Sequence, residues 1–192
     1  MSLTGAEQAI LDHLVAEPGP VTWSSPRSPG GWVTSTRSGG GAGADPATVQ
    51  FRKSRTFSGC QLHEVDFVTP DGRPQGMLVR TWQEPDGSWM AAPIGGGGGG
   101  GGEPYGSRPW VNFAAQWNTH LFAAGGHVIG HGAEAAHLVR LTFADETAIE
   151  DTAENGVVLF FASPGVAFPA RVEILSAAGD VLAEYDEFDD LE

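Results

Sequence analysis

The chain has 192 residues, 41% of them hydrophobic, and a formal net charge of −14 at pH 7. That length and apolar content are typical of a folded protein with a substantial core, and the acidity argues against nucleic acid and anionic membranes as partners. The single cysteine, Cys60, excludes an intrachain disulfide. Residues 1–7 lack a signal-peptide pattern and no stretch has the ~20 apolar residues of a membrane span, so we expect a cytoplasmic protein.

The charge is distributed unevenly along the chain. Residues 1–60 carry five basic and four acidic side chains, whereas residues 141–192 carry one basic and thirteen acidic ones. We therefore expect a protein partner of the acidic end to be basic.

The first predicted element is an amphipathic helix over residues 4–16. Thr4 and Glu7 have the spacing of a capping box at its start. Apolar residues recur at every fourth position and share one face: Ala6, Ile10 and Leu14. That face either docks on a sheet of the same chain or binds a partner.

Residues 18–48 are rich in Gly, Pro, Ser and Thr, with a short strand predicted at 32–36 and a flexible loop at 39–43. From residue 49 the pattern becomes that of strands. Strands at 62–68, 77–82 and 88–91 are separated by Pro-Asp-Gly turns. Proline presets the first turn dihedral and Asp-Gly tolerates the next ones, which predicts an antiparallel meander.

Eight consecutive glycines occupy residues 95–102. Because glycine has no side chain and loses the most backbone entropy on folding, the run predicts a loop. We therefore divide the chain into a helix plus meander at 1–94, a Gly-rich loop at 95–109, and a second β unit with an acidic tail at 110–192.

The second unit contains short strands separated by turns. These are predicted at 137–143, 148–150, 157–162, 170–175 and 181–185, whereas 110–123 fits a helix or strands. The apolar run at 157–161 predicts a strand covered on both faces. The fold class is therefore mainly β: an antiparallel β-sandwich, or two packed β units, with one N-terminal α-helix.

The strand and turn pattern at 139–145, 155–161 and 169–183 resembles the immunoglobulin-like β-sandwich modules of actinobacterial proteins of unknown role. The resemblance covers about the last quarter of the chain. It implies an immunoglobulin-like β unit and carries over no functional residue.

A cluster of histidines is the strongest pattern with chemical meaning. Four fall within eighteen positions: His120, His127, His131 and His137. Imidazole nitrogens with one carboxylate form a donor set for zinc, the one cofactor that the sequence suggests. The candidate metal ligands are His127, His131, Glu134 and His137. Glycines at 125, 126, 130 and 132 are instead typical of a loop, in which the histidines are simply exposed.

Two further groups of charged side chains lie on the predicted strands. Glu64 and Asp66 share one face of a strand, where they form either a carboxylate pair for acid–base chemistry or a solvated face, and His63 points the other way. The only basic cluster comprises Arg52, Lys53 and Arg55. It contacts a phosphate or an acidic partner, or forms ion pairs with the acidic last third of the same chain.

Residues 184–192 interleave acidic and aromatic side chains. Such an end is either solvated and frayed or docks into a basic, apolar groove. The candidate partner-binding residues are Tyr185, Phe188, Asp189 and Asp190.

No P-loop, Gly-x-Ser-x-Gly elbow, Cys-x-x-Cys or His-Glu-x-x-His motif occurs in the sequence. These features favour a non-catalytic protein-binding or assembly module. Two alternatives remain open: a small metal-binding protein or metal-dependent hydrolase that uses residues 120–137, and a structural protein of a phage or other assembly.

Overall fold

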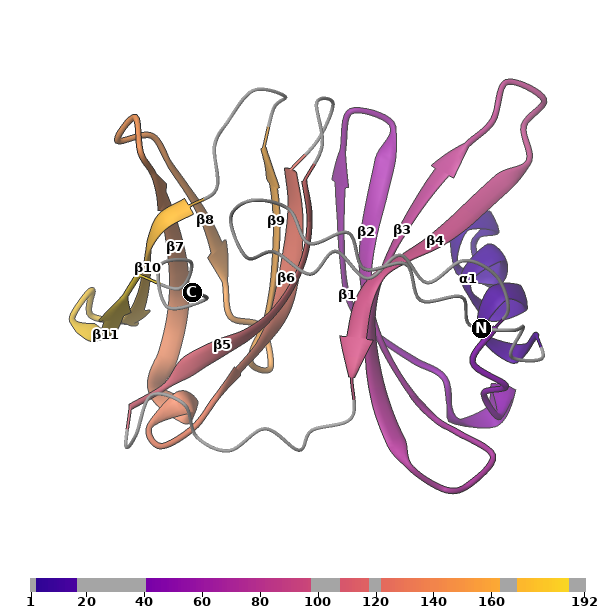
Figure 1. The fold of residues 1–192 in the computed structure, drawn as a ribbon, viewed down its shortest axis with the longest axis horizontal. Coiled ribbons are helices and arrows are strands. Elements are labelled where there is room, and N and C mark those ends of the chain that lie inside the picture. Colours follow the sequence, from indigo (N-terminus) through magenta and orange to yellow (C-terminus); the bar gives the residue numbers. More distant parts are fainter. Residues whose placement is uncertain (1–2, 17–40, 98–107, 118–121, 163–168, 187–192) are drawn as a thin grey trace, which may run out of the picture.

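The computed structural model describes residues 3–16, 41–97, 108–117, 122–162 and 169–186. The chain is mainly β, with one α-helix and three antiparallel sheets, which confirms the predicted fold class (Figure 1). The predicted strand at 32–36 and the first two residues of the predicted loop at 39–43 lie outside the described residues. No helix in the described part of the chain has the length and apolarity to cross a membrane.

Helix α1 spans Gly5–Val15 and begins with the predicted capping box. The Thr4 hydroxyl accepts a hydrogen bond from the Glu7 backbone N–H, and the Glu7 carboxylate accepts one from the Thr4 N–H at 2.7 Å. Ile10 and Leu14 are fully buried, and the helix packs on strands β3 (Pro74–Gln83) and β4 (Trp89–Gly97). The apolar face of the helix therefore docks on a sheet of the same chain.

Replacing Thr4 by alanine is expected to lower the free energy of unfolding by about 1 kcal/mol, because the Glu7 backbone N–H loses the hydroxyl that accepts its hydrogen bond. Urea denaturation would measure the change. Thr4→Ser retains the hydroxyl and should stay within experimental error of wild type. Equal losses in both variants would contradict a capping role.

The first sheet is an antiparallel meander with the strand order β1-β2-β3-β4 (Figure 1). Its strands are β1 (Gln50–Phe57), β2 (Cys60–Val68), β3 (Pro74–Gln83) and β4 (Trp89–Gly97), and a short 3-10 helix, η1 (Pro46–Thr48), precedes them. Turns at Thr69–Gly72 and Glu84–Gly87 are closed by backbone hydrogen bonds. Both predicted Pro-Asp-Gly turns and the meander are confirmed.

Strand β4 continues three residues into the glycine run. Gly95, Gly96 and Gly97 pair with β3, so the prediction of a loop beginning at Gly95 is wrong for these residues. A side chain at Gly95 would lie 2.9 Å from the Cβ of Ala114 on strand β5 (Trp110–Trp117). Glycine is therefore favoured here by the close approach of two strands. Residues 98–107 lie outside the described residues.

Two more sheets follow in the second half of the chain. The middle sheet has the order β5-β6-β9 and the outer sheet the order β11-β10-β7-β8. The strands are β5 (Trp110–Trp117), β6 (Phe122–Ile129), β7 (Ala136–Phe143), β8 (Ala148–Thr152), β9 (Val157–Ala162), β10 (Pro169–Ser176) and β11 (Val181–Tyr185), with a 3-10 helix, η2 (Ala133–Ala135), before β7. The predicted loop-like character of Gly125 and Gly126 is wrong, because both lie inside β6.

Helix α1, the first sheet, the middle sheet and the outer sheet stack as successive layers (Figure 1). Val65, Phe67, Met77 and Val79 pack with the helix. Leu62, Leu78, Ala123, Leu159 and Phe161 fill the space between the first and middle sheets. Phe122, Val139, Phe143, Phe160 and Ile174 belong to the cluster between the middle and outer sheets.

Strand β9 is buried along its whole length. Leu159 and Phe161 point toward the first sheet, whereas Val158 and Phe160 belong to the cluster with the outer sheet. The sequence prediction of a strand covered on both faces is confirmed. The middle sheet thus has an apolar core on each side. The backbone N–H and C=O groups at its edges must therefore find hydrogen-bond partners beyond the sheet.

Candidate metal centre

The basic cluster on β1 splits into two groups with different partners. The register between β1 and β2 passes from Phe51 opposite Val65 to Lys53 opposite Glu64, which leaves Arg52 as the extra residue of a β-bulge. Side chains of directly paired residues share a face of the sheet. The bulge therefore places Phe51 on the helix side and Lys53 on the side of the middle sheet.

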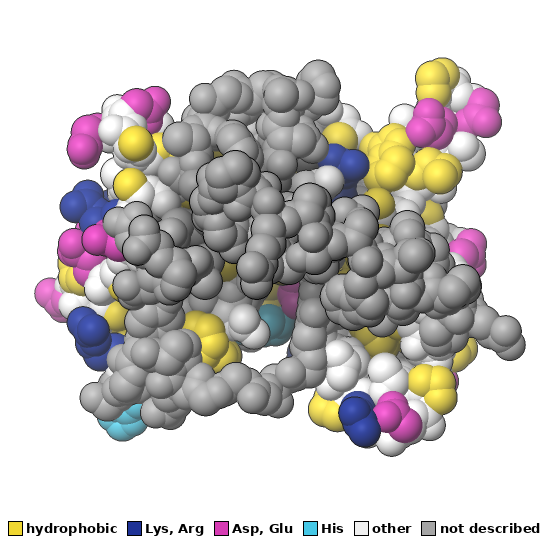
Figure 2. Space-filling view, in the orientation of Figure 1, with side chains coloured by type: hydrophobic (Ala, Val, Ile, Leu, Met, Phe, Trp, Pro, Cys, Tyr) yellow, Lys and Arg dark blue, Asp and Glu magenta, His cyan; other side chains and the backbone are white. Residues whose placement is uncertain are grey.

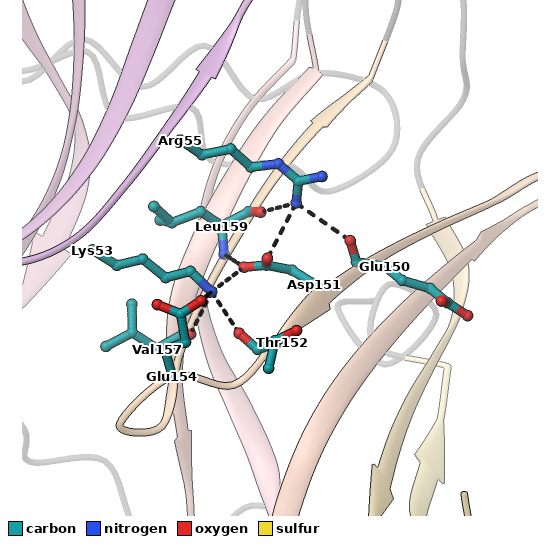
Figure 3. Close-up of polar contacts among 8 residues, drawn as sticks. All are labelled: Lys53, Arg55, Glu150, Asp151, Thr152, Glu154, Val157 and Leu159. Atoms are coloured by element: carbon teal, nitrogen blue, oxygen red, sulfur yellow. Dashed lines mark hydrogen bonds and ion pairs between the residues drawn. The ribbon is translucent and has the colours of Figure 1, made fainter. Parts of the chain in front are cut away.

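Lys53 and Arg55 contact the edges of the two other sheets (Figure 3). The Lys53 ammonium lies 2.7 Å from Asp151 Oδ2 and also donates to the carbonyl oxygens of Thr152 and Val157. Arg55 donates to the carbonyls of Glu150 and Leu159, and Asp151 accepts the Leu159 backbone N–H at 2.7 Å. These contacts confirm the prediction of ion pairs with the acidic last third of the chain.

Arg52 instead reaches the candidate site, a cluster of Glu64, Asp66 and His127. Its Nε lies 2.5 Å from Asp66 Oδ2. Glu64 and Asp66 share the face of β2 that looks toward the middle sheet, and His127 comes from β6. Among the described residues, this is the one group of three or more His, Cys, Asp or Glu side chains whose donor atoms all lie within 4.8 Å of one another.

The three donor atoms converge beside a glycine on β3. Glu64 Oε1 and His127 Nε2 are 3.0 Å apart. A Cβ on Gly76 would lie 3.2 Å from Glu64 Oε1, 3.5 Å from Asp66 Oδ1 and 3.8 Å from His127 Nε2. Gly76 pairs with Asp66 in the register of β2 and β3. The missing side chain at this position leaves space between the donors.

The cluster lies at the border between the interior and the surface. The Glu64 side chain is 5% exposed, whereas those of Asp66 and His127 are 30% and 34% exposed. In the space-filling view a histidine and an acidic side chain are visible near the middle of this face (Figure 2). An ion or small ligand can therefore reach donors that are held partly inside the protein.

The electrostatics of the cluster favour a positive charge at His127. The hydrogen bond with Glu64 raises the pKa of His127 above its usual value, and the charges of Glu64 and Asp66 add to this effect. Burial and the charge of Arg52 act in the opposite direction. A proton shared with Glu64 satisfies the pair, and a metal cation can replace that proton.

The neighbouring His63 has a different role. It points to the helix side, as predicted, and its Nε2 lies 3.3 Å from the Thr81 hydroxyl oxygen. Burial lowers the pKa of His63, with a smaller opposing effect from Glu7. This neutral, buried imidazole is a core residue rather than part of the cluster.

The predicted metal ligands are only partly brought together. His127 joins Glu64 and Asp66, whereas His131, Glu134 and His137 are exposed and belong to no such cluster within the described residues. His120 lies outside the described residues. The predicted placement of Glu64 and Asp66 on one face is confirmed. No pattern in the sequence links them to His127, because strand pairing and layer stacking determine that contact.

Of the candidate partner-binding residues, only Tyr185 is described. Its hydroxyl accepts a hydrogen bond from the Val111 backbone N–H at 2.8 Å, and its ring packs against the core between the middle and outer sheets. Tyr185 thus stabilises the contact between β11 and β5. Phe188, Asp189 and Asp190 lie outside the described residues, and their role in binding a partner stays a prediction.

No family model, curated protein or solved structure matches this chain. The resemblance to immunoglobulin-like modules therefore stays a prediction, and the functional argument rests on the geometry of the cluster.

Proposed function

We propose that this protein binds a divalent first-row transition-metal ion through Glu64, Asp66 and His127. The observation that carries the proposal is the convergence of two carboxylate oxygens and one imidazole nitrogen beside Gly76, within 4.8 Å of one another. These side chains come from two different sheets, so a bound ion would link the first sheet to the middle sheet.

The donor set and its spacing suit Zn²⁺ or Mn²⁺. Imidazole favours zinc and related ions, whereas carboxylates also suit manganese. Two neighbouring ligands, each about 2.1 Å from an ion, lie about 3.0–3.4 Å apart. The separation of 3.0 Å between Glu64 Oε1 and His127 Nε2 falls in this range. Three protein ligands leave further coordination positions for water or another ligand.

Titration calorimetry of the full-length protein with Zn²⁺ and with Mn²⁺ tests the proposal. Wild type should bind one ion, and Glu64→Gln and His127→Ala should each weaken binding at least tenfold, because the first removes the negative charge of a ligand and the second removes the imidazole ligand. The double variant His131→Ala/His137→Ala removes exposed histidines and is the matched control. Absence of stoichiometric binding by wild type, or equal loss in the control, would overturn the proposal.

Gly76→Ala tests the space between the donors rather than the donors themselves. The added Cβ would lie 3.2 Å from Glu64 Oε1, the end of a side chain that can move by a few tenths of an ångström. We therefore expect the urea midpoint to stay near that of wild type while metal affinity falls at least tenfold. Unchanged affinity in a folded Gly76→Ala protein would argue that the ion does not sit beside this residue.

A further inference from the structure

We propose that the metal-loaded cluster and Arg52 together bind an oxyanion, the phosphate or carboxylate group of a ligand. This inference rests on the proposed metal site and names the class of ligand that its open positions take.

Asp66 holds Arg52 in a position to bind an anion beside the metal site. The Arg52 Nε donates to Asp66 Oδ2, whereas Asp66 Oδ1 is the oxygen that faces Gly76. One carboxylate can thus bind the metal through one oxygen and orient Arg52 through the other. The Arg52 side chain is 47% exposed, and its two Nη groups donate to none of the described residues. They are available for the bidentate contact that guanidinium makes with phosphate or carboxylate.

The local charge favours an anion once the metal has bound. Without a metal, Glu64 and Asp66 together outweigh Arg52 by one negative charge when His127 is neutral, and the four groups sum to zero when His127 is protonated. A divalent cation changes this balance to one positive charge, with His127 neutral as a ligand. The nearby Lys53 does not alter the count, because its ammonium is already paired with Asp151. An anion is therefore attracted only after the metal has bound, and a chain with a net charge of −14 offers it little attraction elsewhere.

Cobalt(II) is a suitable probe because its visible absorption reports changes of its ligands. The full-length protein, saturated with Co²⁺, would be titrated with inorganic phosphate and, separately, with acetate. We expect at least one of the two anions to give a saturable change in the spectrum of Co²⁺-loaded wild type. Calorimetry should detect no binding of that anion to the metal-free protein. Which anion binds more tightly distinguishes a phosphate-bearing from a carboxylate-bearing ligand.

Arg52→Gln, also saturated with Co²⁺, should bind the anion at least tenfold more weakly than wild type. The control is Arg73→Ala, which alters an exposed arginine on the β2–β3 turn and should bind the anion as wild type does. Failure of wild type to bind Co²⁺ would refute the metal site itself. Stoichiometric Co²⁺ with no response to either anion, anion binding without metal, or equal affinity in Arg52→Gln would overturn this inference alone.

Discussion

Lys53→Met is expected to lower the free energy of unfolding by about 3–5 kcal/mol, because it leaves a buried carboxylate without its main counter-ion. The Lys53 side chain is 7% exposed and that of Asp151 is 13% exposed. The carbonyls of Thr152 and Val157 would also lose their contact with the ammonium. Arg55 remains beside Asp151 at 3.3 Å, so the lower end of this range is expected. Denaturation by urea with two spectroscopic probes would measure the loss.

A second variant separates the buried charge from the loss of packing. In Lys53→Met/Asp151→Asn the amide still accepts the Leu159 N–H but carries no charge, so the double variant should be more stable than Lys53→Met alone. Arg73→Ala also removes one positive charge, but from an exposed pair with Asp71, and should leave the midpoint unchanged. Equal effects of Lys53→Met and Arg73→Ala would contradict a structural role for Lys53.

The location of Lys53 explains why this contact matters to the fold. Strands β1, β8 and β9 each lie at an edge of their sheets. Lys53 and Arg55 of β1 bond backbone carbonyls of β8 and β9, and the carboxylate of Asp151 bonds a backbone N–H of β9 (Figure 3). Among the described residues, no further strand pairs with these edges of β8 and β9. Side chains thus take the place of a strand and form hydrogen bonds with the backbone groups there. The compact ammonium of the chain's only lysine suits this place, because it offers three donors to closely spaced acceptors.

Much of the first half of the fold follows from local sequence signals. The capping box, the four-residue apolar spacing and the two Pro-Asp-Gly turns each act within a few residues, and the structure confirms all three. The strand at 157–161 was also predictable, because an apolar run without polar alternation has no solvated face.

The candidate site could not be predicted in the same way. Glu64 and His127 are 63 residues apart, and the strands that carry them lie in different sheets. The β-bulge at Arg52 decides which basic side chain meets Asp66 and which meets Asp151, yet no residue of β1 is a glycine or proline that would mark it. Closeness in sequence groups the histidines with one another, whereas the fold joins His127 to carboxylates of another layer.

The glycines of β6 lie in a strand and not in the predicted loop for a physical reason. Adjacent glycines are typical of loops, but a strand also needs glycine where another backbone approaches closely. Gly125 faces the first sheet and Gly126 lies against β5. At Gly125 the crowding comes from Leu78 of the first sheet and from β9, whereas at Gly126 it comes from the backbone of β5, the neighbouring strand of the same sheet. Glycine in β6 therefore reflects close approach of its surroundings rather than freedom of the chain.

Gly126→Ala is expected to destabilise the protein by about 2–3 kcal/mol, because the new Cβ would overlap with backbone atoms that cannot rotate away. It would collide with the carbonyl oxygen of Asn112 and lie 3.2 Å from the Cα of Phe113. The overlap can be relieved only if β5 and β6 move apart. Such a movement would displace His127, which is the next residue on β6. We therefore expect metal affinity to fall together with the urea midpoint.

Gly125→Ala is the matched control on the same strand. Its Cβ would lie 2.7 Å and 2.8 Å from the terminal methyl groups of Leu159 and Leu78, and 3.0 Å from the Val158 carbonyl oxygen. The methyl groups can move by rotation of their side chains, so we expect a smaller loss of about 1 kcal/mol and a smaller change in metal affinity. If Gly125→Ala proved as damaging as Gly126→Ala, the spacing between the first and middle sheets, rather than the approach of β5, would limit this strand. Because His127 faces the first sheet, that spacing would then also set the distance between His127 and the two carboxylates.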